Sequence, residues 1–221
     1  MVLVERGTFT MGCTHEQVGE CKQDEKPAHT VTISTFYISK YEVTQEEYSA
    51  LVGADPYQKC PHCPVGNIYW EAAQTFIKKL DSLTGKKYRL PTEAEWEFAA
   101  RGGNKTKGFK YSGSNNVKQV AWISDNSKDS SHVVGQKKPN ELGLYDMSGN
   151  VYEWCSDWYD ENYYAASSKE NPKGGKDTGR EYATRGGSAM FGANQCRVST
   201  RSEGVPEFWI IYSGFRLVMD K

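Results

Sequence analysis

Hydrophobic and polar residues alternate in several short segments of the chain, as they do in half-buried strands. Val2–Met11 reads as a strand, a bend at Gly7 and a second strand. His29–Ser39 alternates in the same way and is rich in β-branched residues, which favour strands. From Leu142 onward, further short strands are predicted between long loops. We therefore expect a small, twisted, mostly antiparallel sheet.

Three other segments carry the signals of helices. Apolar residues recur at helical spacing between Trp70 and Leu80, and Gly85 suits the left-handed residue that ends such a helix. Two capping boxes, in which a hydroxyl and a carboxylate each satisfy a free backbone N–H, predict the other two helices. They are Thr44-Gln-Glu-Glu47, which starts a helix to about Val52, and Thr92-Glu-Ala-Glu95, whose helix ends at Gly102-Gly103.

The remaining chain is polar and rich in turns, above all in residues 103–139 and 159–179. Neither a linker nor an internal repeat interrupts the pattern, so residues 1–221 are expected to form a single domain. The predicted fold class is α+β, with a few helices beside a small twisted antiparallel sheet and much irregular chain.

One apolar segment is unusual in this polar chain, whose mean hydropathy is -0.71. Phe208-Trp-Ile-Ile-Tyr212 places five bulky apolar residues in a row. Such a run is typical of a fully buried strand, but an exposed apolar patch of the same composition marks a binding surface. Consecutive bulky residues point to both faces of a strand, which argues against a half-buried one. The run alone leaves both interpretations open.

The charge balance excludes some classes of partner. Net charge is -1 and the pI is about 6.4, so no basic excess is available to bind nucleic acid.

No apolar stretch approaches the ~18–20 residues of a membrane span, and no signal peptide opens the chain. Because Met1 leads directly into a predicted strand, an export segment or a lipid anchor would have to lie upstream of this sequence.

The six cysteines are even in number, which fits an oxidising compartment. Cys60-Pro-His-Cys63 has the spacing of half a zinc site, but no second pair of ligands with that spacing lies nearby. A local disulfide or two free thiols therefore explain this pair better than zinc does. The sequence leaves the pairing of the other four open; they are Cys13, Cys21, Cys155 and Cys196.

Several motifs follow one another in order from about Val2 to Val218. They are Phe9-Thr-Met-Gly12, Tyr41-Glu-Val-Thr44, Tyr88–Glu97, Gly143–Val151, Glu153-Trp154, Arg185-Gly-Gly-Ser188 and Gly214-Phe-Arg216. Together they resemble the formylglycine-generating-enzyme or sulfatase-modifying-factor family, which implies a variant of the C-type lectin fold. Trp96, Trp154 and Trp158 are expected in the core, because tryptophan is highly buried on average.

The resemblance also implies an activity, the copper-dependent oxidation of a sulfatase cysteine to formylglycine. It uses two cysteines after the Arg-Gly-Gly-Ser motif, and thiolates are natural ligands of Cu(I). Aligned on Ser188, the second position is Cys196, but the first is Phe191, whose ring neither binds copper nor exchanges disulfides. We therefore expect no catalysis and no bound copper. The family's iron-dependent branch needs a histidine cluster, whereas the four histidines here are scattered.

The segment after Ser188 keeps a framework of family residues and replaces the positions between them. Where polar residues are usual, unrelated and often bulky residues stand. This mosaic resembles the variable proteins of diversity-generating retroelements, in which a rigid lectin-like scaffold carries diversified contacts, and it favours the exposed interpretation of the apolar run. Aromatic residues give paratopes a large contact area with few rotatable bonds. The implied ligand contacts are Ala189, Met190, Phe191, Gly192, Asn194, Gln195, Thr200, Ser202, Glu203, Gly204, Val205, Glu207, Phe208, Trp209, Ile210, Ile211 and Tyr212.

Family members carry calcium on the segment that corresponds to Leu144–Trp154. The resemblance implies, as ligands of one structural Ca²⁺, the side chains of Asp146 and Glu153 and the backbone carbonyls of Gly149 and Val151. Hard oxygen ligands in a glycine-containing turn suit this ion. The alternative is a capped turn without an ion. A second calcium site of the family is not expected, because Val120 replaces its asparagine.

The sequence thus predicts a non-catalytic ligand-binding protein at a bacterial cell surface. Its scaffold covers about 1–188, its variable region about 189–213, and its closing strand 214–218. The ligand is an unknown protein or other surface molecule, and nucleic acid is not expected. Two alternatives remain: a copper-dependent oxidase or related sulfatase-modifying enzyme, and an inert subunit of a larger complex.

Overall fold

The computed structural model describes residues 1–17, 19–53, 60–176, 181–204 and 212–221. Five α-helices occur in these ranges: α1 (Gln45–Val52), α2 (Trp70–Thr84), α3 (Glu93–Ala100), α4 (Val117–Val120) and α5 (Ser124–Ser127). The strands are β1 (Val2–Val4), β2 (Gly7–Met11), β3 (His29–Ile33), β4 (Phe36–Ile38), β5 (Tyr152–Trp158), β6 (Tyr182–Arg185), β7 (Ser202–Gly204), β8 (Ser213–Gly214) and β9 (Val218–Asp220). The short 3₁₀ turns are η1 (His15–Gln17), η2 (Gln23–Glu25), η3 (Gly103–Lys105), η4 (Tyr163–Ala165) and η5 (Ala193–Cys196).

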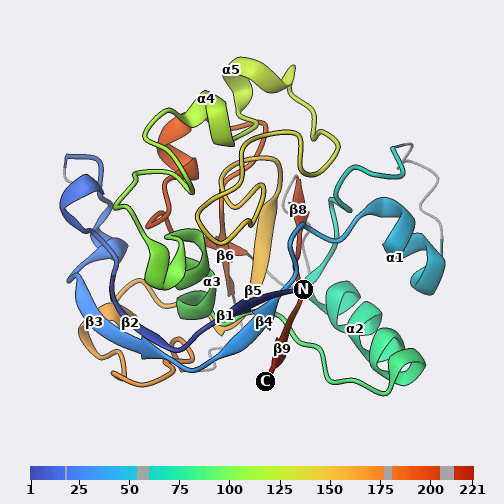
Figure 1. Ribbon diagram of the computed structural model, residues 1–221, viewed down its shortest axis with the longest axis horizontal. Helices are drawn as coiled ribbons and strands as arrows, with labels where there is room; N and C mark the ends of the chain where they lie inside the picture. Colours follow the sequence, from blue (N-terminus) through green and yellow to red (C-terminus); the bar gives the residue numbers. More distant parts are fainter. Residues whose placement is uncertain (18, 54–59, 177–180, 205–211) are drawn as a thin grey trace.

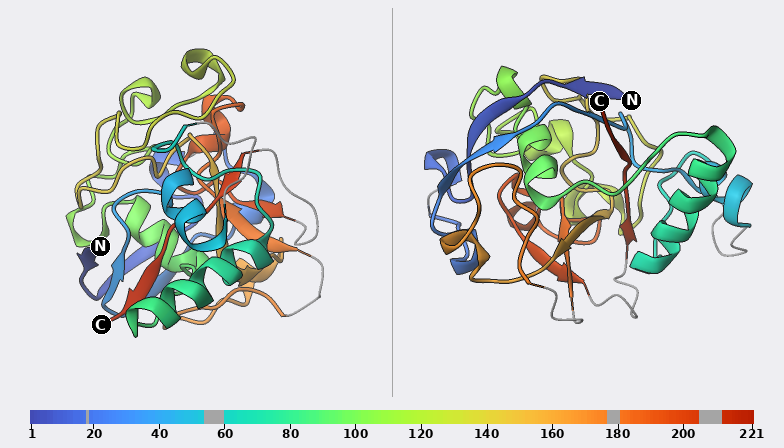
Figure 2. Two further views of the ribbon diagram at one scale, coloured as in Figure 1. Left: turned by 90° about the vertical axis from the view of Figure 1, so that its right-hand side faces the viewer. Right: turned by 90° about the horizontal axis from the view of Figure 1, so that it is seen from below.

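The described strands form three small sheets. One has the order β1-β4-β9, one pairs β2 with β3, and the largest has the order β7-β6-β5-β8. Each pair is antiparallel except β5 with β8, which run parallel. Because β1 and β9 flank β4, the two ends of the chain lie close together (Figures 1 and 2). The predicted α+β class with small, mostly antiparallel sheets is confirmed.

The predicted helices are also confirmed. Thr44 and Thr92 both cap a helix, and each accepts the backbone N–H three residues on while the glutamate of its box reaches back. Gly85 ends α2 in the left-handed conformation, with φ 69°. In Figure 1, α1 and α2 lie together on one side of the molecule, away from β2 and β3.

Two of the predicted strands are wrong in detail. The stretch His29–Ser39 is interrupted after Ile33, because β3 pairs with β2 while β4 belongs to a different sheet. The closing strand, predicted over 214–218, is likewise divided between β8 and β9. Phe215 and Leu217 lie between them, and their carbonyls accept from Val43 and Ser39, so the chain crosses from one sheet to another here.

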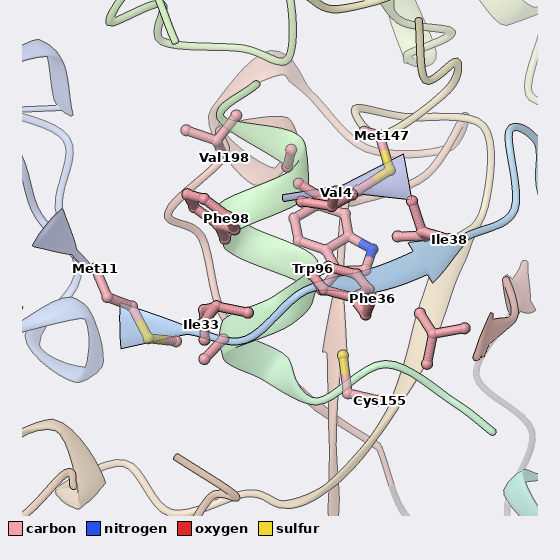
Figure 3. Close-up of a cluster of buried hydrophobic side chains, with 14 of the residues drawn as sticks. Val4, Met11, Ile33, Phe36, Ile38, Trp96, Phe98, Met147, Cys155 and Val198 are labelled. Carbon is pink, nitrogen blue, oxygen red and sulfur yellow. The ribbon is translucent and has the colours of Figure 1, made fainter. Parts of the chain in front are cut away.

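The first hydrophobic cluster surrounds Trp96, which is fully buried on α3 (Figure 3). Residues from β1, β3, β4 and the loop at Met147 pack around this ring. A second cluster fills the space between α2 and β5, where Phe76 meets Phe215 edge to face at 5.4 Å. Trp154 is fully buried in this second cluster, as predicted, whereas Trp158 is only half-buried at its edge.

Buried arginine–carboxylate pairs hold the C-terminal motifs to the scaffold. Arg185 contacts Glu97 of α3 at 2.6 Å, and Arg216 contacts Glu153 of β5 at 2.6 Å. A third arginine, Arg197, reaches Glu25 at 2.5 Å. All three guanidinium groups are buried, so these arginines of the sequence motifs have structural roles. A buried pair is costly to break because it leaves an uncompensated charge.

Four of the cysteines form two disulfides, Cys13–Cys21 and Cys60–Cys63. The second confirms a local disulfide in the Cys-Pro-His-Cys motif. Cys155 and Cys196 are free and buried.

Candidate ligand-binding face

The described part of the segment 189–213 runs over the edge of the largest sheet. A turn at Ser188–Phe191 leads into η5, and the chain then continues through Arg197 and Arg201 into β7, next to β6. The framework residues fix both ends of this path. Arg197 is bound by Glu25, and Arg201 by Glu93 of α3 at 2.7 Å.

Two bulky apolar side chains of this segment reach solvent. Met190 and Phe191 are 39% and 40% exposed, and both belong to the small set of large hydrophobic residues that are exposed in the described chain. The rings of Phe191 and Tyr152 meet edge to face, with their centroids 5.6 Å apart. Their exposure has no explanation in core packing, and exposed apolar groups are typical of binding surfaces.

Phe191 also lines a pocket of about 440 Å³, which we call the acidic pocket. Its walls come from five parts of the chain: the start of η2, β5, the loop that follows β5, β6 and the segment 189–213. Pockets that receive a ligand group usually combine apolar surface with a few convergent polar groups. The lining residues are Lys22, Gln23, Asp24, Tyr152, Tyr159, Glu161, Thr184, Phe191, Arg201, Ser202 and Glu203.

The other predicted contact residues divide into exposed and buried ones. Asn194 and Glu203 are exposed, and Gly192, Gln195 and Ser202 are half-buried. The remaining described residues of this part, Ala189, Thr200 and Gly204, are buried. Because they are buried, these three residues offer little surface to a ligand in this structure.

Of the apolar run that the sequence singles out, only Tyr212 is described. It is half-buried with φ 63°, its N–H donates to Asn67 Oδ1 at 2.7 Å, and its hydroxyl donates to the Asp129 carbonyl at 2.8 Å. The other predicted contacts lie outside the described residues: Val205, Glu207, Phe208, Trp209, Ile210 and Ile211.

The position that would matter most for oxidation chemistry is Cys196. Its thiol is fully buried, and burial raises its pKa to about 12, so the thiolate form is not populated at neutral pH. The Cβ of any residue but glycine at position 187 would lie 2.6 Å from this sulfur, so Gly187 and Cys196 are packed together. Phe191, which the sequence predicts at the position of the family's first cysteine, lies on the surface.

The residues implied for calcium lie between the loop at Asp146 and the start of β5. Asp146 Oδ2 accepts the Gly135 N–H at 2.7 Å, while its buried Oδ1 has no hydrogen-bond partner among the described residues. Burial raises the pKa of Asp146 to about 6. Glu153 accepts from Arg216 with both oxygens, each at 2.6 Å, and from Trp96 Nε1 at 2.6 Å. An ion would find a free oxygen on Asp146 but would compete with Arg216 for Glu153.

Sequence reasoning missed a third carboxylate of this region, Glu42. It is buried and accepts from Asn150 Nδ2 at 2.7 Å and from the Val151 N–H at 3.3 Å. Burial, together with the charges of Asp146 and Glu153, raises the pKa of Glu42 well above its usual value. Within the described residues, no three or more His, Cys, Asp and Glu side chains form a group that could hold a metal, so the calcium ion stays a prediction.

With this geometry in place, comparison with known proteins gives the class of the chain. Residues 1–221 match the sulfatase-modifying factor enzyme 1-like domain, and the chain belongs to this family. It is 35% identical over 210 residues to the chaperone protein LppX of Paenibacillus barcinonensis, an alignment that covers 72% of this chain and 71% of the relative. It is 36% identical over 177 residues to a formylglycine-generating enzyme of Streptomyces coelicolor, which covers 72% of this chain and 54%, about half, of that enzyme.

Among solved structures, the chain is similar to Treponema denticola variable protein 1. The TM-score is 0.87 at 29% identity, and the match covers 100% of this chain and 95% of the other. The family and the likeness to a variable protein, both expected from the motifs, are confirmed. No helix within the described ranges has the length and apolar character needed to cross a lipid bilayer.

Proposed function

We propose that the protein is a non-catalytic ligand-binding protein whose segment 189–213 forms a diversified binding face on a C-type-lectin-like scaffold at a bacterial surface. The observation that carries this proposal is the exposure of Met190 and Phe191 beside the acidic pocket, on a segment anchored by buried Arg197 and Arg201. The framework and the exposed residues are separate sets of side chains. Replacement of the exposed ones therefore leaves the ion pairs of the framework intact.

The likeness to a Treponema denticola protein described as variable supports the same proposal. Fully burying an aromatic side chain contributes roughly 1.5–3 kcal/mol, so a few such residues would support useful affinity after the costs of ordering.

The competing function is sulfatase modification, because formylglycine-generating enzymes are among the relatives. We do not expect sulfatase modification, for a chemical reason. Copper chemistry of this kind needs a pair of accessible thiolates, whereas Cys196 is buried with a raised pKa and Phe191 offers no sulfur.

The proposal is tested by sequencing the gene for this protein in sister isolates. Substitutions are expected to fall within 189–213 and to spare Cys196, Arg197, Ser199 and Arg201, whose side chains are buried. Substitutions scattered evenly over 1–221 would contradict a diversified face.

A second experiment addresses catalysis directly. A cysteine-containing sulfatase peptide is incubated with the protein, copper and air, and formylglycine is measured by mass spectrometry. We expect no conversion. Conversion that disappears in the Cys196→Ser variant would establish the enzyme and refute the proposal.

A further inference from the structure

The acidic pocket has more negative than positive charge available to a ligand. Three carboxylates line it, from Asp24, Glu161 and Glu203. Of the two cations in its wall, Arg201 is only 1% exposed, and its guanidinium is bound by both oxygens of Glu93 at 2.7 and 2.9 Å. Its charge is therefore matched inside the protein and does not compensate the pocket.

The second cation of the wall is Lys22. Lys22 is exposed, and its Nζ donates to the side chain of Gln195 at 3.1 Å. The excess of negative charge affects Glu203, whose pKa is raised by partial burial and by the neighbouring charges of Glu181, Asp24 and Glu161. The positive charge of Lys22 opposes this rise in the pKa of Glu203 but does not outweigh burial and the three like charges.

Two residues of the pocket wall carry buried oxygens that lack hydrogen-bond partners among the described residues. Asp24 Oδ1 is buried and unpaired, although its other oxygen accepts from the Tyr159 hydroxyl at 2.8 Å. Thr184 is 0% exposed, and its hydroxyl oxygen is unpaired as well. Buried polar atoms are nearly always paired, so each unpaired one needs an explanation. A carboxylate oxygen can only accept, which means that its missing partner is a donor.

Aromatic rings complete the wall. Tyr152, Tyr159 and Phe191 all line the pocket. Ring faces attract cations and also cover the apolar stem that carries the charge of a lysine or arginine side chain. An anion would face three carboxylates, and a purely apolar group would leave Asp24 Oδ1 unpaired.

We infer that the acidic pocket binds the basic side chain, lysine or arginine, of a protein ligand, with the charged head against Asp24 and Glu203 and the stem along Phe191 and Tyr159. This inference rests on the proposed binding function and narrows its ligand. The scaffold supplies Asp24, Tyr159 and Thr184, whereas Phe191 and Glu203 belong to the variable segment. The preference for a cation is accordingly a property of the residues now present at those two positions.

In the test, the whole protein is titrated with small probes, and binding is monitored through the NMR signals of the tyrosine and phenylalanine rings. n-Butylammonium and n-butylguanidinium represent the two basic side chains, and n-butanol is the neutral control of the same shape. Both cations are expected to shift the pocket rings with affinities at least ~tenfold above that of butanol, because a hydrogen bond to a charged group is among the stronger ones.

Variants locate the effect. Asp24→Asn is expected to weaken cation binding about tenfold and Glu203→Gln about threefold, because the first removes a buried acceptor charge and the second an exposed one. Glu71→Gln, on the exposed side of α2, is the matched control and should leave binding unchanged. Thermal unfolding of each variant shows whether it is folded. Equal binding of butanol, unchanged binding in both pocket variants, or no binding of either cation would overturn the inference.

A third experiment distinguishes a basic side chain of a protein from a free polyamine, since both carry an alkylammonium group. The peptide acetyl-Gly-Lys-Gly-amide is compared with free spermidine. Binding of the peptide supports a protein ligand, and binding of spermidine alone would refute it. The proposed function fails separately: isolates that vary throughout the chain would remove the diversified face whatever the pocket binds, whereas a pocket without cation affinity would leave that face standing.

Discussion

Glu93 is the residue whose replacement best tests how the framework holds the binding segment in place. Glu93 is 1% exposed, and its carboxylate accepts from Arg201 at 2.7 and 2.9 Å and from Arg185 at 3.1 Å. Burial alone would raise its pKa, but the two guanidinium groups outweigh burial, and the pKa of Glu93 is lowered. In the Glu93→Gln variant, Arg185 keeps Glu97 at 2.6 Å, whereas Arg201 loses its carboxylate and keeps two backbone carbonyls and the rings of Tyr159 and Tyr164 among the partners in the described residues.

Removing one partner of a buried pair costs about 3–5 kcal/mol, because the other charge stays buried without compensation. For a chain of this length, that corresponds to a fall in Tm of about 10 °C. Glu46→Gln is the matched control, since its ion pair with His62 at 3.3 Å is largely exposed and should contribute less than about 1 kcal/mol.

Urea unfolding followed by tryptophan fluorescence measures both free energies at pH 7. Because the folded-state pKa of Glu93 is depressed, its contribution is present above about pH 4.5 and is lost as the pH falls below that value, so the two proteins should converge in acid. A loss below about 1 kcal/mol at neutral pH would refute the reasoning.

Phe191→Ala should change the free energy of unfolding by less than about 0.5 kcal/mol, whereas Phe98→Ala, in the core, should cost about 3–5 kcal/mol in the same urea titration. Cys196 should resist iodoacetamide at pH 8 in the folded protein and react after unfolding, as mass spectrometry would show; rapid native labelling would contradict its burial. Burial raises the pKa of Asp157 to about 8, above its unfolded value, so stability should decline between about pH 4 and 8, and Asp157→Asn should flatten that decline in urea titrations at several pH values. If calcium binds at Asp146, EDTA should lower Tm, added Ca²⁺ should restore it, and Asp146→Asn should abolish this response. A Tm that neither EDTA nor Ca²⁺ changes would favour the alternative, a capped turn without an ion.

The sequence predicted those parts of the fold that local chemistry decides. Thr44 and Thr92 cap their helices because a hydroxyl and a glutamate three residues later suffice to pair the free N–H groups, whatever the rest of the chain does. The break after Ile33 could not be read in this way. It arises because β3 and β4 find partners in different sheets, and pairing between distant segments leaves no trace in the alternation of one of them.

The candidate site also has one part that the local sequence predicts and one part that depends on distant segments. The departure of Phe191 and Glu203 from the family pattern pointed to the segment itself. The opposite wall of the acidic pocket, with Asp24, Tyr159 and Thr184, comes from segments far apart in the sequence, and no local pattern connects them. The burial of Thr200 was equally unreadable, because it depends on which side of a turn faces the scaffold.

The pairing of β4 with both β1 and β9 has a practical consequence. It brings Met1 and Lys221 to one edge of the molecule, and in the second view of Figure 2 the orange strands that carry part of the pocket wall lie at the opposite edge. A biotin tag, a sensor chip or a fluorescent fusion joined through either end would accordingly be attached at the edge opposite these strands. The protein is suited to oriented immobilisation without any redesign of its fold.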